Sequence, residues 1–304
     1  MASPFPSFTP TWRTSTYTHI NPLSNPTIKS SISGKSVLIT GGGGSIGTAT
    51  ALSFAGAGAT HIALLSRKVD KLQAVKTCVE EKYTATKIYI YPVDVTDKVA
   101  IDYAFASFSH EIGGGKGEGK IDILISGAGH GLMHHIRDID PSTFSAHFDI
   151  NVKGALLVTQ AFLHHGKENG VVVNLTSAAS LMPTAQACAY SASKAAAAQF
   201  FSVLQVEHPA LRVFNVHPGV VESAMNEVNK ITAMDDVSLP ADFTVWVATE
   251  EAAFLKGRYV FANYDAKELM ERKEEIEASG LLSVWLEGQP RIAVAEVDKV
   301  LQGN

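Results

Sequence analysis

The sequence predicts an α/β fold in which a single doubly wound parallel sheet is covered by helices on both faces. Short runs of β-branched and aliphatic residues alternate with longer segments of helical pattern from residue 35 to residue 217. The short runs are almost continuously apolar, which is typical of parallel strands buried on both sides. The first run ends in a glycine-rich turn that opens directly into a helical segment, and right-handed crossovers are expected throughout.

The alternating part of the chain contains the elements of this sheet. The predicted strands cover residues 36–40, 61–66, 87–91, 121–126, 171–176 and 212–216. The predicted helices cover residues 46–57, 69–82, 98–112, 141–165 and 188–207. The alternation weakens beyond Gly219, where we expect a helix at 241–249, a short strand at 258–261 and a highly charged helix at 267–278.

Composition argues against several classes of partner. The chain has 304 residues, of which 46% are hydrophobic, and a formal net charge of −5. It has no long run of Lys and Arg, and no apolar run approaches the ~20 residues that cross a membrane, so we expect neither nucleic acid nor a membrane as a partner. Its two cysteines lack zinc-type spacing and cannot make a disulfide framework. Since the start of the chain also lacks a secretory pattern, a cytoplasmic location is expected.

The glycine-rich turn after the first strand indicates a dinucleotide-binding site of the Rossmann type. Residues 37–47 read Val-Leu-Ile-Thr-Gly-Gly-Gly-Gly-Ser-Ile-Gly and pass from strand to turn to helix start. Glycines let the backbone approach a pyrophosphate, and the N–H groups of a helix N-terminus attract its charge. The expected cofactor contacts here are Gly41, Gly43, Ser45 and Ile46. The other glycine-rich segment, 113–119, precedes a strand and is expected to be a surface loop.

The ends of the next strands indicate which dinucleotide is bound. An acidic residue after the second strand would hold both ribose hydroxyls of NAD, but the sequence has Ser66 and Arg67 there. Ser66 can donate to a 2′-phosphate and Arg67 can pair with it, which predicts NADP(H). The alternative is that Arg67 is a solvated loop residue. We expect Asp94 to accept from the adenine amino group and Gly127 to let the backbone pass close to the cofactor ribose.

A tyrosine and a lysine four residues apart form the candidate catalytic pair. Tyr190 and Lys194 lie in a predicted helix, so their side chains project from the same face. A nearby positive charge lowers the pKa of a phenol, which is ~10 when free, and so favours proton exchange with an alcohol. Ser177, at the end of a predicted strand, can hold the reacting oxygen. The same spacing also occurs in helices where the Tyr side chain packs in the core and the Lys side chain is solvated. The interpretation as a catalytic pair therefore depends on the other motifs that occur in order along the chain.

Together, these motifs resemble the short-chain dehydrogenase/reductase family over residues 35–223. The resemblance rests on Thr40-Gly41-x-x-x-Ser45-Ile46-Gly47, Asp94-Val95, Gly127-Ala128-Gly129, Ile150-Asn151-Val152-Lys153-Gly154, Ser177, Tyr190-x-x-x-Lys194 and Pro218-Gly219. Residues 223–304 resemble the tails of fungal members associated with secondary metabolism. Two positions depart from the family pattern: Ser45 replaces a glycine of the turn, and Ser126 replaces the first asparagine of the usual Asn-Asn-Ala-Gly. Neither change removes a catalytic group.

The resemblance implies a role for each residue of the reaction site. Tyr190 is the general acid/base. Lys194 binds the nicotinamide ribose hydroxyls and lowers the pKa of Tyr190. Ser177 orients and polarises the substrate carbonyl, and Asn151 anchors a water in a proton relay to Lys194.

The resemblance also implies further contacts. The backbone of 218–221, including Val221, holds the nicotinamide carboxamide, and Ser223 assists. A homodimer or homotetramer is expected, in which helices 141–165 and 188–207 pack against a second subunit.

The two ends of the chain differ in composition from the 34–262 dinucleotide-binding catalytic domain. Residues 1–33 are rich in Pro, Ser and Thr, which disfavours helix and central strand. We expect either an N-terminal arm on the domain or a partner subunit, or disorder. Residues 263–304 are expected to be a helical C-terminal extension packed on the domain or a partner. An apolar patch within it should be buried in the core or at a subunit contact: Leu281, Leu282, Val284, Trp285 and Leu286.

The substrate pocket is expected to be apolar. Residues 181–187 should border it and residues 222–239 should form a flexible lid. The side chains expected to line it are Leu132, Met133, Met182 and Met225. For His130, a substrate contact is favoured over metal binding. No metal is expected, because His130, His134 and His135 have no acidic partner at helical spacing.

The predicted function is that of an NADPH-dependent oxidoreductase in secondary metabolism, which reduces a ketone or oxidises a secondary alcohol of an apolar small molecule. Two alternatives stay open, because a fold does not fix a function. One is a redox-neutral epimerase, dehydratase or isomerase on the same fold. The other is a non-catalytic NADP-binding sensor or scaffold.

Overall fold

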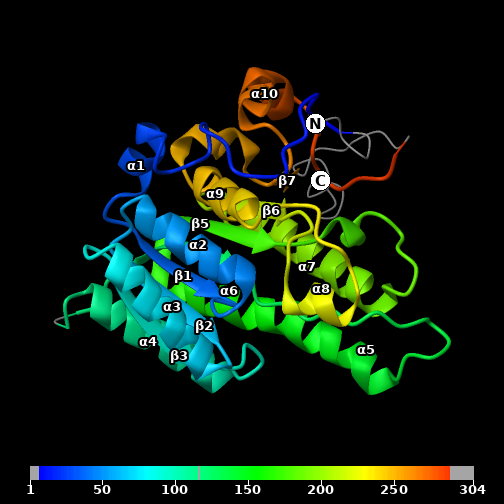
Figure 1. Ribbon diagram of the computed structural model, residues 1–304, viewed down its shortest axis with the longest axis horizontal. Coiled ribbons are helices and arrows are strands. Elements are labelled where there is room, and N and C mark those ends of the chain that lie inside the picture. Colours follow the sequence, from blue (N-terminus) through cyan, green and yellow to red (C-terminus); the bar gives the residue numbers. More distant parts are fainter. Residues whose placement is uncertain (1–6, 116, 288–304) are drawn as a thin grey trace, which may run out of the picture.

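A computed structural model describes residues 7–115 and 117–287 of the chain. Its centre is a seven-stranded sheet in which every pairing is parallel and the strand order is β3-β2-β1-β4-β5-β6-β7 (Figure 1). The strands are β1 (Ser36–Thr40), β2 (His61–Ser66), β3 (Lys87–Pro92), β4 (Ile121–Ser126), β5 (Gly166–Leu175), β6 (Arg212–His217) and β7 (Tyr259–Phe261). The order reverses between β1 and β4, and ligands of such sheets bind at the carboxyl ends beside this point.

Helices cover both faces of the sheet, which confirms the predicted fold class. One face packs against α2 (Ser45–Gly56), α3 (Val69–Lys82) and α9 (Ser238–Val247). The other packs against α4 (Lys98–Ile112), α6 (Gly154–His165) and α7 (Cys188–Glu207). Successive residues of β1 show the alternation, because Val37 and Ile39 join the first core cluster and Leu38 joins the second.

The predicted helix at 141–165 has a break in its middle. It consists of α5 (Pro141–Phe148), a π-helical turn η1 (Asp149–Lys153) and α6. A π turn shifts the hydrogen-bond pattern by one residue, and such turns are frequent at functional sites. Asn151, one of the predicted site residues, lies in this turn.

Two short helices occur where the sequence predicted none. The first, α1 (Pro26–Ile32), begins at a proline, and the Asn25 side chain accepts a hydrogen bond from the Thr27 N–H. Proline disfavours the interior of a helix but suits its first position, so the expectation of no helix was wrong here. The second, α8 (Ala224–Val228), lies within the predicted lid and begins at Ser223.

The charged helix expected at 267–278 is split. The structure has α10 (Ala266–Glu271) and α11 (Lys273–Ala278), with Arg272 between them. The Arg272 guanidinium donates to the Phe8 carbonyl at 2.9 Å and to Glu275. Two 3-10 turns, η2 (Ala178–Ser180) and η3 (Glu250–Leu255), complete the helical elements of the described residues.

The N-terminal arm, from residue 7 onward, packs on the rest of its own chain. Ile20, Ile28 and Ile32 are fully buried in the core cluster that also holds α2 and α9. In Figure 1 this blue segment lies alongside α9 and α10. Residues 1–6 lie outside the described residues, and the division into arm, domain and extension stays a prediction.

The apolar patch near the C-terminus is only partly covered. Leu282 packs against the core, and its carbonyl accepts from the Tyr259 N–H at 2.7 Å. Val284, Trp285 and Leu286 are 48%, 45% and 73% exposed, so the expectation of core burial was wrong for these three. Their burial at a subunit contact stays a prediction.

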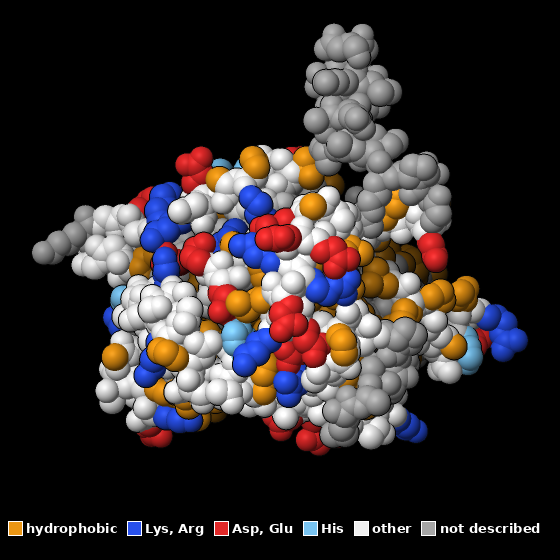
Figure 2. Space-filling view, turned by 90° about the horizontal axis from the view of Figure 1, so that it is seen from above, with side chains coloured by type: hydrophobic (Ala, Val, Ile, Leu, Met, Phe, Trp, Pro, Cys, Tyr) orange, Lys and Arg blue, Asp and Glu red, His pale blue; other side chains and the backbone are white. Residues whose placement is uncertain are grey.

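Acidic and basic side chains are interspersed on the face seen from above α10. Figure 2 shows Lys and Arg next to Asp and Glu across this face, with scattered hydrophobic side chains between them. The described part of this face therefore lacks the large basic area that binding to nucleic acid would need. Within residues 7–115 and 117–287, no helix combines the length and apolar character of a membrane span.

Candidate active site

Tyr190 and Lys194 lie in the first two turns of α7, where Lys194 is buried and Tyr190 is half-buried. Burial raises the pKa of Tyr190, while a side-chain contact with Ser177 acts in the opposite direction. Burial also lowers the pKa of Lys194 to about 8. The Lys194 ammonium donates to the Leu175 carbonyl at 2.8 Å. Burial is therefore the main influence on the Tyr190 pKa in this structure, and the lowering of that pKa by Lys194 stays a prediction.

Ser177 follows directly after β5 and faces Tyr190. Its side chain accepts from the Ala179 N–H at 3.3 Å and begins the turn η2. Its carbonyl accepts from the Tyr259 hydroxyl at 2.7 Å, which ties the end of β5 to β7. The position of Ser177 is thus fixed by the sheet on one side and by the turn on the other.

Asn151 connects the π turn to the loop after β4 and to α7. Its Oδ1 accepts from the His130 N–H at 2.8 Å, and its Nδ2 donates to the His130 carbonyl and to Ser193 Oγ, both at 2.9 Å. These contacts satisfy the whole amide group of a nearly buried residue. Asn151 therefore holds the backbone beside Gly129, close to the Lys194 ammonium.

The glycine turn forms a close backbone contact at the carboxyl ends of β1 and β4. Gly41 has a φ of +74°, and a Cβ there would lie 2.8 Å from the Gly127 carbonyl oxygen. A Cβ at Gly47 would overlap the Gly41 carbonyl oxygen. Thr40 Oγ1 accepts from the N–H groups of Gly127 and Ala128 at 3.0 and 3.1 Å. This hydroxyl helps to fix the strand end at which Ser126 departs from the family pattern.

Four predicted cofactor residues form two pairs near the ends of β2 and β3. Gly43 lies beside Ser66, and Arg67 lies beside Asp94. A Cβ built on Gly43 would lie 3.3 Å from Ser66 Oγ. The Arg67 guanidinium is 3.8 Å from the Asp94 carboxylate and 69% exposed. Burial acts to raise the pKa of Asp94, but hydrogen bonds from Thr96 and the charge of Arg67 lower it overall. One Asp94 oxygen is already used by Thr96, at 2.9 and 2.8 Å.

Two cavities meet at Tyr190. One, of about 380 Å³, is lined by most of the predicted cofactor residues: Gly41, Ser45, Ile46, Gly127, Lys194, Val221 and Ser223. The other, of about 450 Å³, is lined by Ser177 and by mostly apolar side chains. The residues common to both are Thr176, Tyr190, Pro218, Gly219, Met225 and Asn226. The phenol is therefore placed where a molecule in one cavity meets a molecule in the other.

The larger cavity corresponds to the predicted substrate pocket. Met133, Met182 and Met225 line it, whereas Leu132 does not. Residues of the predicted lid also line it, namely Asn226, Asn229, Ile231, Met234 and Asp235. His130 lies outside the lining, because its ring packs against His147 at a centroid distance of 4.6 Å. The described residues contain no group of three or more potential metal ligands.

Sequence reasoning missed several residues of this cavity. Trp12 and Thr14 come from the arm, and Phe261 and Asn263 come from the end of β7 and the segment after it. The aromatic residues of the arm, including Phe8, Trp12 and Tyr17, were a usable indication that the segment packs on something. The contact by which Asp235 fixes the loop after β6 was also missed; its carboxylate accepts from the Val220 N–H at 2.7 Å.

The family assignment follows from comparison with known proteins. A family model described as short chain dehydrogenase matches residues 35–233. The chain belongs to the short-chain dehydrogenase/reductase family. It is 33% identical over 259 residues to the short chain dehydrogenase/reductase nsrO of Aspergillus novofumigatus, covering 80% of this chain and 85% of the relative. It is 34% identical to a short chain dehydrogenase/reductase of Claviceps purpurea, covering 81% and 84%. These relatives confirm the resemblance to fungal members of the family associated with secondary metabolism.

Solved structures agree with the fold. A short chain dehydrogenase from Burkholderia cenocepacia in complex with NADP superposes with a TM-score of 0.69 at 25% identity, covering 78% of this chain and 99% of that one. An NAD⁺-bound xylitol dehydrogenase gives a TM-score of 0.67 at 26% identity, covering 76% and 98%. Members of this family thus use nicotinamide cofactors of both kinds.

Proposed function

We propose that this protein is an NADPH-dependent reductase that converts a ketone of an apolar small molecule to an alcohol, or catalyses the reverse oxidation, in fungal secondary metabolism. The observation that carries the proposal is the position of Tyr190 between the two cavities. A phenol at that junction can exchange a proton with an oxygen bound next to Ser177. Hydride transfer and proton transfer can then occur at neighbouring atoms of one carbonyl.

The smaller cavity fits a dinucleotide. The backbone that lines it leaves no room for a side chain at Gly41, because a Cβ there would contact the Gly127 carbonyl. The N-terminus of the twelve-residue helix α2 opens into it at Ser45 and Ile46, where free N–H groups favour a pyrophosphate. When bound, the nicotinamide supplies the hydride, and the protein supplies orientation and proton transfer.

Each remaining residue has a defined task in this proposal. Ser177 donates to the carbonyl oxygen of the substrate and holds it against Tyr190. Lys194 holds the ribose hydroxyls beside Gly129, and Asn151 keeps that loop in place. Val221 and Ser223 contact the carboxamide end of the same cavity.

The electrostatics of Tyr190 support the reductive direction. Burial raises the pKa of its hydroxyl, so the group keeps its proton at neutral pH. Reduction of a ketone needs a protonated acid at the start of the reaction, whereas oxidation of an alcohol needs a base. Tyr190 in the resting protein is therefore in the protonation state that reduction requires.

The preference for NADPH rests on the residues at the end of β2. Ser66 and Arg67 occupy the position at which an acidic residue would bind the ribose of NAD. The Arg67 guanidinium is largely exposed and held by only one long contact to Asp94, so it is available to a 2′-phosphate.

The decisive experiment measures oxidation of NADPH and NADH against a panel of ketones, with the products identified by mass spectrometry. We expect turnover with NADPH and an alcohol as the product. Product without net consumption of cofactor would indicate an epimerase, dehydratase or isomerase instead. Cofactor binding without turnover of any panel member would indicate a sensor or scaffold.

A further inference from the structure

The N-terminal arm forms part of the wall of the larger cavity. Trp12 and Thr14 line it together with Ser177 and Tyr190, although more than 160 residues separate them in the sequence. The Trp12 ring packs against Phe261 and Tyr264 at centroid distances of 6.4 and 6.3 Å. The arm therefore reaches the proposed substrate site from outside the α/β core.

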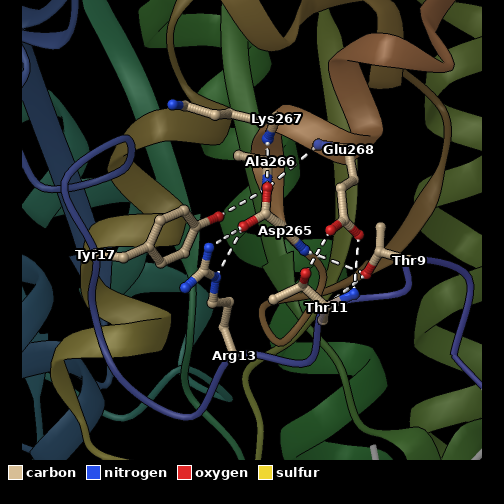
Figure 3. A network of polar contacts seen from close by, with 8 residues as sticks. All are labelled: Thr9, Thr11, Arg13, Tyr17, Asp265, Ala266, Lys267 and Glu268. Atoms are coloured by element: carbon tan, nitrogen blue, oxygen red, sulfur yellow. Dashed lines mark hydrogen bonds and ion pairs between the residues drawn. The ribbon is translucent and has the colours of Figure 1, made fainter. Parts of the chain in front are cut away.

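A network of polar contacts holds this part of the arm in place (Figure 3). The Arg13 guanidinium donates to the Asp265 carboxylate at 2.6 and 2.8 Å, and the Thr11 N–H donates to Glu268 at 3.0 Å. The Ala266 N–H donates to the Tyr17 hydroxyl oxygen at 2.7 Å. Figure 3 shows these arm side chains gathered around the start of α10. Trp12 is thus fixed between two anchored neighbours.

The same stretch of arm is connected to the loop that the proposed nicotinamide site uses. Asn263 Nδ2 donates to the Arg13 carbonyl and to the Asp235 carboxylate, both at 2.8 Å. Asp235 in turn accepts from the Val220 N–H, and the Asp236 N–H donates to the Thr14 carbonyl at 2.7 Å. The arm, the end of the lid and the loop after β6 therefore form one connected wall.

The chemistry of this cavity favours a flat aromatic ligand without charge. Four of the six methionines in the chain line it: Met133, Met182, Met225 and Met234. Thioethers make favourable contacts with aromatic rings and adapt their shape, and Trp12 and Phe261 add two aromatic faces. Among the described lining residues there is no Lys or Arg, and burial lowers the pKa of His217 to about 4, so this side chain is neutral at physiological pH. The one carboxylate in the described lining, that of Asp235, already accepts hydrogen bonds from the Val220 N–H and Asn263 Nδ2.

We propose that Trp12, positioned by the arm, is a specificity-determining residue that selects neutral substrates with fused aromatic rings. The proposal rests on the proposed function for the site but concerns ligand binding, which can be measured without turnover. Trp12 contacts the ring system of the substrate while Ser177 and Tyr190 hold its carbonyl. The cavity of about 450 Å³ lies within the range that drug-sized ligands occupy, roughly 300–1,000 Å³.

The test compares the binding of butanone, tetralone and fluorenone, which carry no aromatic ring, one such ring and two. Each ketone is titrated calorimetrically into the full-length protein saturated with NADP⁺ or NAD⁺, whichever it binds, so that no reduction occurs. We expect the wild-type affinity to rise along the series. Trp12→Ala should weaken fluorenone binding by about tenfold and butanone binding by less than about twofold. Trp12→Phe should restore most of the loss.

Phe8→Ala is the matched control. The Phe8 ring also packs against Tyr264, at a centroid distance of 6.0 Å, but does not line the cavity. If Trp12 only anchors the arm, the two alanine variants will lose stability and fluorenone affinity to the same extent, which overturns the proposal. Arg13→Gln, which loosens the arm without changing its rings, should weaken fluorenone binding by a smaller factor than Trp12→Ala.

Two further outcomes are decisive. A wild-type protein that binds butanone as tightly as fluorenone overturns the proposed substrate class. A protein that binds fluorenone through Trp12 but reduces no ketone with either cofactor leaves this inference standing and rejects the reductase. Failure of the specificity proposal for Trp12 is thus distinguishable from failure of the proposed reductase function.

Discussion

The two cavities that meet at Tyr190 are built in different ways. The smaller one is lined mainly by residues of short motifs at strand ends, such as Gly41 to Gly47 and Tyr190 to Lys194. The larger one is assembled from the arm, the lid and the segment after β7, with Trp12 and Asn263 more than 250 residues apart. In the proposed reductase, the residues for the reaction are thus encoded locally, whereas the substrate range depends on tertiary packing. Changes in the first cavity should affect all substrates alike, and changes in the second should discriminate between them.

The largest expected effect comes from Tyr190→Phe. Loss of the hydroxyl removes the proposed proton donor, so kcat should fall by ~10²–10⁴-fold for every ketone that is reduced. The dissociation constant for NADPH should stay nearly unchanged. Steady-state kinetics and a fluorescence titration with NADPH measure the two quantities. Tyr103→Phe, at a side chain that is 70% exposed, is the control. Wild-type rates in Tyr190→Phe would reject the mechanism.

A methyl group at Gly47 should disturb the floor of the cofactor cavity. Because the added Cβ would overlap the Gly41 carbonyl, the backbone has to shift, at a cost of about 1–3 kcal/mol in the free energy of unfolding. NADPH affinity should fall as well. At Gly44 the added Cβ would be 3.3 Å from the same oxygen, so Gly44→Ala should have the smaller effect. If Gly47→Ala and Gly44→Ala lose the same stability in urea unfolding and the same NADPH affinity in the titration, this account of the turn is contradicted.

Arg67→Ala tests the proposed preference for NADPH. Loss of one charge-assisted contact to the 2′-phosphate should raise the KM for NADPH by about tenfold and leave the KM for NADH unchanged. Lys68→Ala removes a neighbouring positive charge and is the matched control. If both variants raise the two KM values equally, Arg67 is only a solvated loop residue, as the alternative interpretation holds.

The last prediction is a pH dependence of stability that arises from Lys194. Its pKa is about 8 in the folded protein against an ordinary value of 10.5, so between these values the unfolded chain binds more protons. The free energy of unfolding contributed by this group therefore rises with pH across that window and is lowest below pH 8. Lys194→Met should remove this rise. Its stability advantage over the wild type in urea unfolding should shrink from pH 7 to pH 10, whereas exposed Lys29→Met should show no such trend.

The sequence predicted the sheet well, and most of the predicted cofactor residues line one cavity. Strands β1, β2 and β4 occur within the predicted bounds, because continuous apolar runs between turns specify buried parallel strands. The motif residues depend on neighbours a few positions away, so their placement at strand ends could be inferred. The π turn at Asp149–Lys153 could not be, because its residues continue the helical pattern on both sides.

The arm residues that line the larger cavity could not be predicted from the sequence, for a different physical reason. Trp12 and Thr14 acquire their place only through contacts such as that of Arg13 with Asp265, which no local pattern encodes. The electrostatics of the catalytic pair also required the structure. Spacing indicated that Lys194 lies beside Tyr190, but the degree of burial decided that the Tyr190 pKa is raised.

The ion pair between Arg13 and Asp265 has a consequence for the order of events during synthesis. The arm is among the first segments to leave the ribosome, whereas Asp265 emerges 252 residues later. At about 5–20 residues per second, Arg13 is synthesised roughly 13–50 s before Asp265. Strands β1 to β6 can pair during this interval. Trp12 cannot yet complete its packing against Phe261 and Tyr264, which are synthesised late. The residues that line the smaller cavity are therefore all synthesised before the last residues of the larger cavity.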